Sequence, residues 1–427
     1  MTGGALSITL ATANDRVGGA GVAASRLRDG LLAQGHDVQL FVQTQSLPHP
    51  ATVSAKSSLQ RTLNRMRSGI DSLPVRRSGG APEAFSASWL PRRWPTLAQV
   101  GQRQLVHLHW TNAGFFSVRD IAAISVPVVW TLHDMWALTG GCQYDAGCDR
   151  FAQGCGACPL LAKPARAADL SSRRFNAKRS NWAAQNLTLV APSRWLAAQA
   201  RRSPILQGKR VEVLHNGLDL RRFKPLDRGF ARQALGLPQD QRLVLFGALN
   251  PGSDARKGYD LLQDAVAHLA ADEVLRGQLS LVVFGSSPER EERVHGLRAI
   301  HFGHLSDDLA LALLYAACDV FVAPSRQDNL PNTVAEALAC GTPCVAFNIG
   351  GMPDLIQHRG HGYLAEPFDA ADLAQGIAWC LSQQDQRWQG LCAAARAHAE
   401  LHLNLATQTA LHVDLYRELL TAERSSP

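Results

Sequence analysis

Short apolar runs alternate with helical patterns in this sequence, and two such series follow one another along the chain. In the first half, strand-like runs stand at residues 6–11, 38–42, 105–109, 128–132 and 187–191, and residues 21–34 carry an amphipathic helical pattern. In the second half, similar runs stand at residues 243–246, 279–284, 320–323 and 344–347. Each series is typical of a parallel sheet covered by helices on both faces.

The restart of this pattern near residue 212 predicts two α/β domains in tandem. We expect two Rossmann-like, doubly wound parallel-sheet domains that face each other across a cleft, the first at residues 1–211 and the second at 212–402. A last helical pattern within 403–427 is expected to return to the first domain. The length of 427 residues agrees with this division, because a single core seldom grows so large. Ligands of such sheets bind at the carboxyl ends of the strands.

The composition excludes several classes of protein. With 46% hydrophobic and 19% charged residues, the chain is neither disordered nor fibrous. No apolar run reaches the length of a membrane-spanning helix, and the first strand-like run lacks the basic flank of a secretory signal. We therefore expect a cytoplasmic protein. In that compartment the nine cysteines favour thiols or metal ligands over a disulfide framework.

Positive charge is concentrated in residues 51–94. This segment holds eight Lys and Arg residues and two acidic ones, which accounts for nearly all of the net charge of +7. The segment is interpreted either as a contact for anionic lipid headgroups or a phosphate-bearing substrate, or as a solvated helix face with a loop. Binding of nucleic acid is not expected, because only Phe85, Trp89 and Trp94 are interleaved with these basic residues.

A glycine-rich turn, Gly18-Gly-Ala-Gly21, follows the first strand and begins a helix. It fits a loosened dinucleotide-binding fingerprint, but the second strand ends in Gln43-Thr44, where a nicotinamide site would need an acidic residue. Two readings remain. Either the backbone N–H groups of the turn approach a phosphate, or the glycines only permit a tight turn between strand and helix.

A cationic pair, Arg256-Lys257, stands between a strand and a helix of the second series. At the carboxyl edge of a sheet, such a pair is well placed to neutralise a diphosphate leaving group. The alternative is a basic turn that faces solvent.

The most informative segment is residues 324–343, PSRQDNLPNTVAEALACGTP. It predicts a strand end, a polar loop, a helix from about Thr333 to Ala339 and a stop at Gly341. Asp328 lies in the loop and Glu336 lies eight residues later in the helix, so both carboxylates could reach one ligand held above the helix N-terminus. Alternatively, Asp328 only stabilises the turn and Glu336 is a surface residue.

These residues resemble the donor-binding signature of retaining glycosyltransferases of the GT-B architecture, in glycosyltransferase family 4. The match extends from Asp328 through Glu336 to Gly341-Thr-Pro343. Further segments agree in order and spacing: Gly18–Gly21, Thr131–Asp134, Ala191–Ser193, His215–Asp219, Arg256–Gly258, Phe302–Leu305 and Gly350–Asp354. The resemblance includes bacterial transferases of exopolysaccharide and colanic acid assembly.

The resemblance implies roles for single residues. Glu336 would hold the ribose hydroxyls of a nucleotide sugar, Lys257 its diphosphate, and Asp328 the hydroxyls of the donor sugar. Gly19 would bring a backbone N–H to the distal phosphate, and His133 would lie against the transferred sugar. The remaining residues form the rest of the donor site: Asn329, Leu330, Pro331, Asn332 and Thr333 close over sugar and phosphate, and Leu305 lines the base pocket.

Two departures from the family pattern concern the donor site. The first carboxylate is usually Glu and is here Asp328, which is one methylene shorter. An Arg that often follows the glycine of the preceding strand is absent, since this chain reads Gly247-Ala-Leu-Asn250, and Arg256 could replace it. No cofactor is expected for catalysis, because the chain shows no Asp-x-Asp pair of the kind that holds a metal on a nucleotide diphosphate.

His133 is a candidate active-site residue on its position alone, because it follows a parallel strand at its carboxyl end. The alternative is a structural, hydrogen-bonded histidine. His107 and His109 lie on one face of the preceding strand and are secondary candidates.

Four cysteines, Cys142, Cys148, Cys155 and Cys158, lie in a predicted insertion at residues 139–160. Their number and the final C-x-x-C spacing suit a structural zinc site that stiffens a long loop. Disulfides and unligated thiols are the alternatives. A similar cysteine-bearing insertion occurs in the exopolysaccharide subgroup that the chain resembles.

Together these inferences predict a retaining transferase that moves a hexose-type sugar from a nucleoside diphosphate to a glycan or polyprenyl-linked oligosaccharide. The acceptor would lie at the inner face of the cytoplasmic membrane, where the basic segment could contact anionic lipid. A nucleotide-sugar epimerase and a zinc-ribbon protein that binds nucleic acid are the rival functions.

Overall fold

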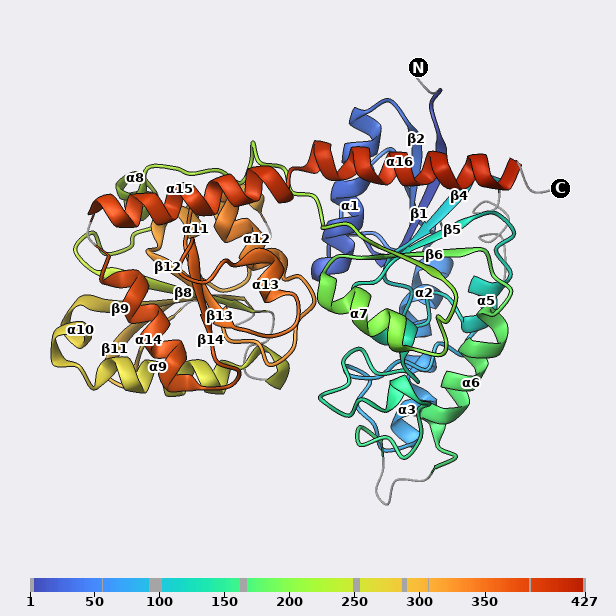
Figure 1. Cartoon of the computed structure of the whole chain (residues 1–427), viewed down its shortest axis with the longest axis horizontal. Coiled ribbons are helices and arrows are strands. Elements are labelled where there is room, and N and C mark those ends of the chain that lie inside the picture. Colours follow the sequence, from blue (N-terminus) through green and yellow to red (C-terminus); the bar gives the residue numbers. More distant parts are fainter. Residues whose placement is uncertain are drawn as a thin grey trace. The chain divides into compact units, whose positions relative to one another are not determined.

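The computed structural model describes residues 4–55, 57–91, 102–161, 167–248, 254–285, 290–305, 307–383 and 385–424. The chain forms two compact units, which are coloured by sequence in Figure 1. Unit 1 combines Met1–Gly217 with Leu405–Pro427, and unit 2 is Leu218–Asn404. The boundaries that the structure gives are therefore at Gly217 and Asn404, where the sequence suggested residues 211 and 402.

Unit 1 is built on a seven-stranded sheet in the order β3-β2-β1-β4-β5-β6-β7, in which all neighbouring strands are parallel. The strands are β1 (Ser7–Asn14), β2 (Asp37–Thr44), β3 (Thr52–Val53), β4 (Leu105–Leu108), β5 (Val128–Thr131), β6 (Leu187–Ala191) and β7 (Arg210–Val213). The pairing of Ile8 with both Val38 and Leu105 fixes the register of the central strand β1.

The helices of unit 1 connect these strands and cover both faces of the sheet. They are α1 (Gly18–Ala33), α2 (Ser58–Asp71), α3 (Leu73–Arg77), α5 (Val118–Ala122), α6 (Leu170–Trp182), α7 (Arg194–Arg202) and α16 (Leu405–Arg424), with short 3-10 turns η1 (Trp136–Leu138) and η2 (Arg150–Ala152). The C-terminal α16 packs against α1, and the Gln34 amide donates a hydrogen bond to the Ala406 carbonyl.

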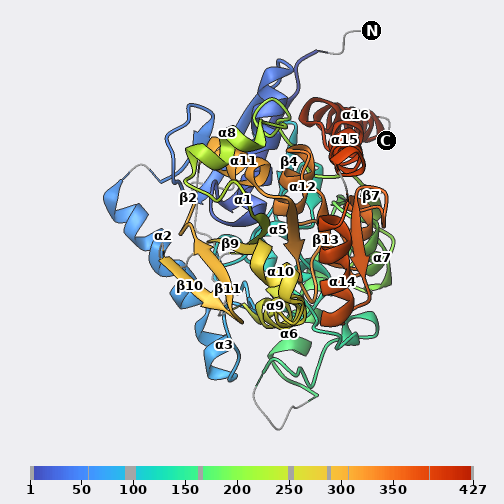
Figure 2. The ribbon, with the colours of Figure 1, turned by 90° about the vertical axis from the view of Figure 1, so that its left-hand side faces the viewer.

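Unit 2 repeats this design with a sheet in the order β10-β11-β9-β8-β12-β13-β14. Its strands are β8 (Arg242–Ala248), β9 (Leu279–Gly285), β10 (Arg290–Val294), β11 (Leu297–His301), β12 (Val320–Ala323), β13 (Cys344–Phe347) and β14 (Gly362–Ala365). All neighbours are parallel except β10 and β11, an antiparallel pair that lies at one edge of the sheet in Figure 2.

The helices of unit 2 are α8 (Arg228–Ala234), η3 (Ala255–Lys257), α9 (Tyr259–Ala270), α10 (Glu273–Gln278), α11 (Asp308–Ala317), α12 (Asn332–Ala339), α13 (Met352–Leu355), α14 (Ala370–Leu381) and α15 (Asp385–His402). Successive residues of β8 enter different cores. Leu243 and Leu245 pack with α11 and α12, whereas Val244 and Phe246 pack with α9 and α14. The sheet is therefore buried on both faces, as parallel sheets are.

The two sheets share one strand order apart from their edges. With the edge strands β7 and β10 left out of the count, both sheets read 3-2-1-4-5-6, the order of doubly wound dinucleotide-binding folds. The chain changes direction across the sheet between β1 and β4 in unit 1 and between β8 and β12 in unit 2. Loops diverge at such a switch point, which makes the carboxyl ends of these strands the expected place for a ligand.

The prediction of two doubly wound parallel sheets is confirmed, and the structure adds elements that the sequence analysis did not identify. These are the edge strands β3, β7 and β14, the antiparallel pair β10–β11 and the separate helix α15. Among the described residues, no helix is long and apolar enough to span a membrane.

Candidate functional site

Two loops meet at the switch point of unit 2. The loop after β8 leads to η3, which carries Arg256 and Lys257, and the loop after β12 carries Asp328. The two loops are joined by backbone, because the Arg326 N–H donates to the Arg256 carbonyl at 2.8 Å. Residues 70 positions apart in sequence are thus held together at the carboxyl ends of the strands.

Lys257 and Arg256 both contact the Asp328 carboxylate. The distance from Lys257 Nζ to Asp328 Oδ2 is 2.6 Å, and the distance from Arg256 Nη1 to the same oxygen is 3.3 Å. Arg256 also donates to the Gln327 carbonyl at 3.1 Å and pairs with Asp254 at 3.0 Å. The cationic pair is therefore not a solvent-facing turn. It points into the segment in which the sequence placed the donor site.

Asp328 is buried and remains ionised. Burial alone would raise the pKa of its carboxyl, but the adjacent charges of Lys257 and Arg256 outweigh burial and lower it below 3.8. The backbone N–H of Asn329 also donates to Asp328 Oδ1, at 3.0 Å. Asp328 thus has a fixed orientation and a fixed charge, as a residue that recognises hydroxyl groups requires.

Two glycines allow this close packing of backbones. Gly258 ends η3 with φ +67°, and a Cβ at that position would lie 1.9 Å from the Pro324 carbonyl oxygen. Gly350 has φ +53°, and a Cβ there would lie 2.0 Å from the Asp328 carbonyl oxygen. Any larger residue would push the loops apart, which explains why both positions belong to the glycine-containing motifs of the sequence.

Glu336 lies within α12 and is buried, with 5% of its surface exposed. Its Oε2 accepts a hydrogen bond from the Tyr315 hydroxyl of α11 at 3.0 Å. Glu336 is thus not a surface residue. The sequence analysis did not identify Tyr315, although a hydroxyl within the apolar run LALALLYAA of α11 was a signal that a buried acceptor lies nearby.

The remaining residues of the predicted donor site surround the start of α12. Leu330 is buried in the core of unit 2, Pro331 precedes the helix, and Asn332 and Thr333 form its first turn. The helix begins without a side-chain cap. Leu305 packs at the margin of the same core. These residues therefore surround a helix N-terminus, which favours an anionic ligand.

In unit 1 the predicted phosphate contact lies at the corresponding switch point. Gly18 has φ +73°, and Gly19 is exposed in the first turn of α1, which also begins without a side-chain cap. A Cβ at Gly21 would lie 2.4 Å from the Asn14 carbonyl oxygen. Gly21 therefore serves the tight turn, while Gly19 stands where a ligand could approach.

His133 follows β5 and contacts a second histidine. The distance from His133 Nε2 to His109 Nδ1 is 2.9 Å, and the two rings are stacked with centroids 5.2 Å apart. His109 stacks in turn on His107, which is held between the Tyr416 hydroxyl at 2.6 Å and the Thr131 hydroxyl at 2.7 Å. The two secondary candidates thus form a buried stack behind His133.

The histidines of this stack are neutral near pH 7. Burial lowers the pKa of His133 to about 3 and lowers the pKa values of His107 and His109 well below 6.5. Of two neutral rings that share one N···N contact, one nitrogen must donate and the other must accept. Because this contact joins Nε2 of His133 to Nδ1 of His109, both rings hold the same tautomer, and the tautomer of His109 fixes which nitrogen of His133 carries its proton.

The four clustered cysteines surround one small cavity in the loop that follows η1. Cys142, Cys148, Cys155 and Cys158 all line it, and Gly140 N–H donates to the Cys155 sulfur at 3.1 Å. Burial raises the pKa of the Cys155 thiol to about 11. Across the described parts of the chain, however, no three His, Cys, Asp or Glu side chains are placed to share a metal ion. The zinc site stays a prediction.

The basic segment divides into two structural classes. Arg67 is partly buried, and its guanidinium donates to the carbonyls of Gly114, Leu90 and Pro91. Exposed side chains make up the second class, namely Arg61, Arg65, Arg76 and Arg77. Lys56, Arg92, Arg93 and Trp94 lie outside the described residues.

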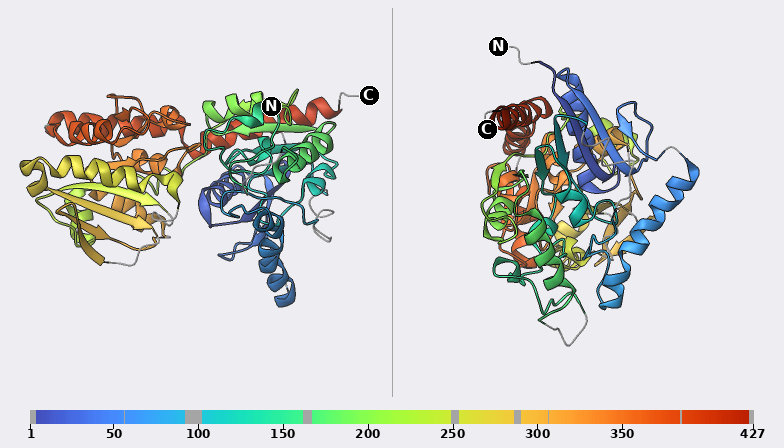
Figure 3. Two further views of the ribbon diagram at one scale, coloured as in Figure 1. Left: turned by 90° about the horizontal axis from the view of Figure 1, so that it is seen from below. Right: turned by 90° about the vertical axis from the view of Figure 1, so that its right-hand side faces the viewer.

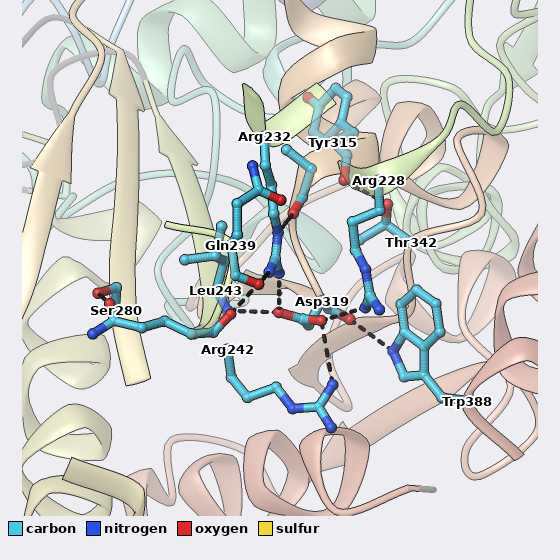
Figure 4. A network of polar contacts seen from close by, with 12 residues as sticks. Arg228, Arg232, Gln239, Arg242, Leu243, Ser280, Tyr315, Asp319, Thr342 and Trp388 are labelled. Atoms are coloured by element: carbon cyan, nitrogen blue, oxygen red, sulfur yellow. Dashed lines mark hydrogen bonds and ion pairs between the residues drawn. The ribbon is translucent and has the colours of Figure 1, made fainter. Parts of the chain in front are cut away.

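A separate cluster of charges at the amino ends of the unit 2 strands has a structural role (Figure 4). Asp319 directly precedes β12, is 1% exposed and pairs with Arg232 at 2.7 Å and Arg228 at 2.6 Å. It also accepts the N–H of Leu243 in β8 at 2.6 Å. Because this cluster joins the amino ends of the strands, it lies away from the candidate site.

Comparison with known proteins assigns the chain to a family. Residues 17–222 match the description "Glycosyltransferase Family 4", and residues 240–383 match "Glycosyl transferases group 1". A D-inositol 3-phosphate glycosyltransferase of Streptomyces bingchenggensis is 34% identical over 228 residues, which are 50% of this chain and 49% of that protein. The matched part of the chain thus spans about half the length of this curated relative.

Two solved structures have the same fold. Sucrose-phosphate synthase of Thermosynechococcus elongatus superposes with a TM-score of 0.67 at 21% identity, covering 98% of this chain and 100% of that one. Anabaena HepE in complex with UDP-glucose superposes with a TM-score of 0.63 at 18% identity, covering 98% of this chain and 100% of that one.

Proposed function

Because the chain belongs to the group 1 glycosyltransferases of family 4 and has their GT-B fold, we propose that it transfers a sugar from a nucleoside diphosphate to a glycan or lipid-linked oligosaccharide. The observation that carries this proposal is the convergence of Lys257 and Arg256 on Asp328 at the switch point of unit 2. Positive charge for a diphosphate and an oriented carboxylate for sugar hydroxyls stand side by side there.

The donor site is proposed as follows. Glu336 accepts hydrogen bonds from the ribose hydroxyls, and Tyr315 holds its carboxylate in place. Lys257 and the N-terminus of α12 bind the diphosphate, and Arg256 replaces the second cation that the family often has. Because Lys257 contacts Asp328 directly, a diphosphate bound to Lys257 and a sugar bound to Asp328 would lie next to each other.

The proposed reaction retains the configuration of the sugar. The bond from the anomeric carbon to the diphosphate oxygen breaks, and a bond from that carbon to an acceptor hydroxyl oxygen forms on the same face. The acceptor proton passes to the departing diphosphate. Fixed positive potential at Lys257 and Arg256 stabilises the charge that develops on the diphosphate, an effect worth a few kcal/mol for one well-aimed group. His133, which is neutral near pH 7, is proposed to contribute a hydrogen-bonding group to the transfer step.

The acceptor is proposed to be a polyprenyl-linked sugar of exopolysaccharide assembly at the inner face of the cytoplasmic membrane. The support is the exposed basic surface of unit 1, which suits a diphosphate-bearing lipid in an anionic membrane.

The test combines product analysis with one variant and a control. The protein is incubated with UDP-glucose and related nucleotide sugars, with and without a polyprenyl diphosphate-linked sugar, and the anomeric proton of the product is measured by NMR. We expect transfer only with acceptor, with the donor's configuration, and its loss in Lys257→Ala but not in Glu366→Gln, an exposed control in the same unit. Release of an epimerised sugar without acceptor would contradict the proposal and support an epimerase.

A further inference from the structure

Helix α2 presents an apolar stripe to the outside of unit 1. Leu59, Leu63, Met66 and Ile70 are exposed by 68%, 52%, 55% and 37%. Their spacing of four, three and four residues places them on one side of the helix. Figure 3 shows α2, the light-blue helix, at the periphery of unit 1.

Amphipathic helices usually bury their apolar side, whereas α2 exposes it. Here polar residues attach α2 to the fold. Asn64 donates to the Gln43 carbonyl at 3.3 Å, Arg67 donates to the Gly114 carbonyl at 2.7 Å, and buried Asp71 accepts the Trp89 N–H at 3.1 Å. These contacts orient the helix, so the fold itself holds the apolar stripe outward.

The exposed charges of α2 and α3 are all positive. They are Arg61 and Arg65 of α2 and Arg76 and Arg77 of α3, while Asp71 of α2 is buried and the exposed Glu83 follows α3. By helical periodicity, Arg61 and Arg65 project from the side of α2 away from the stripe. A helix is about 10 Å across, so these charges lie within roughly one Debye length of any surface that touches the stripe.

We propose that α2 and α3 form a docking surface for an anionic lipid bilayer. The apolar stripe enters the boundary between headgroups and acyl chains, and the arginines attract the lipid phosphates. A second copy of the chain fits this surface less well, because pairing two such patches would bring like charges together. Docking itself does not depend on the proposed function; only the delivery of a lipid-linked acceptor rests on it.

Vesicle flotation of the full chain tests the proposal. The probes are vesicles of phosphatidylcholine alone and of phosphatidylcholine with phosphatidylglycerol. We expect recovery with the anionic vesicles to exceed recovery with the neutral ones and to fall as salt is raised. Equal recovery with both vesicles, or none with either, would overturn the proposal and leave the glycosyl transfer assay unaffected.

Two sets of variants locate the contact. Leu59→Ser, Leu63→Ser and Met66→Ser together should reduce partitioning at least about tenfold, because their apolar area no longer enters the bilayer. The matched control is Phe230→Ser with Val274→Ser, which removes apolar side chains that are 61% and 67% exposed in unit 2. Unchanged partitioning of the triple variant would refute docking through α2. A dimer in light scattering that the triple variant abolishes would show that a second copy occupies the surface instead.

Discussion

Replacement of Asp319 by Ala is expected to destabilise unit 2 by about 3–5 kcal/mol, the usual cost of removing one partner of a buried ion pair. The structure shows why the cost is high. The Arg232 side chain is 6% exposed and would keep its charge with only the carbonyls of Ala317, Gln239 and Gln241 as partners. The Leu243 N–H in β8 would lose its acceptor. Arg228 and Arg242 contribute less, because they are 35% and 40% exposed.

Native-state hydrogen exchange of the full chain measures this effect in each unit separately. A loss of 3–5 kcal/mol accelerates exchange of the most protected amides of β8 and β12 by roughly a hundredfold to several thousandfold. Amides of unit 1 serve as an internal control and should be unaffected. Asp319→Asn should cause a smaller loss, because it keeps one oxygen as an acceptor for Leu243.

The matched control is Glu291→Ala, which removes a surface partner of Arg298 in the same unit and should leave exchange unchanged. If Asp319→Ala accelerates exchange in β8 and β12 by less than tenfold, the cluster does not stabilise unit 2 in the way argued here. Donor affinity of the folded variant should be preserved, since Asp319 lies at the amino ends of the strands.

Two further predictions concern unit 1. Four buried histidines have pKa values lowered from 6.5, so their contribution to the unfolding free energy should be complete above about pH 6.5 and fall as the pH drops below it, by up to about 1.4 kcal/mol per pH unit for each histidine; they are His107, His109, His133 and His412. Urea unfolding between pH 7 and pH 5 measures this dependence of the unfolding free energy on pH. His412→Leu should lower the slope by the contribution of one histidine. An unchanged slope in this variant would refute the assignment. The cysteine cluster is expected to bind one zinc ion per chain, and the variant Cys155→Ser with Cys158→Ser should not bind the ion. Removal of the ion by a chelator should lower the hydrogen-exchange protection of the surrounding loop. Metal-free protein with four thiols that react with a thiol reagent would refute the prediction.

The sequence predicted the two sheets because buried parallel strands leave near-continuous apolar runs, as in residues 279–284 and 320–323. The edge strands were not predicted because they lack such runs. The antiparallel strand β10, for example, reads REERV and is mostly exposed. Its charges protect a sheet edge rather than fill a core, so hydrophobic periodicity cannot detect it.

The candidate site was predictable in part for the same reason. Loops after neighbouring parallel strands must meet, so Lys257 and Asp328 could be placed at one edge from the sequence. Their direct contact at 2.6 Å could not, because it depends on how far two loops approach over Gly258 and Gly350. Tyr315 was missed because its one signal, a hydroxyl within an apolar run, does not show which side chain of another helix accepts its hydrogen bond.

Equilibrium binding of nucleoside diphosphates and their sugar esters to the full chain, measured by calorimetry, examines the proposed donor site itself. We predict that at least one of them binds and that Glu336→Gln weakens binding about tenfold to a hundredfold, the worth of a hydrogen bond to a charged group. Lys257→Ala should weaken binding as well, and the exposed control Glu366→Gln should leave it unchanged. Binding that survives both Glu336→Gln and Lys257→Ala, or the absence of binding by every nucleoside diphosphate, would contradict the account.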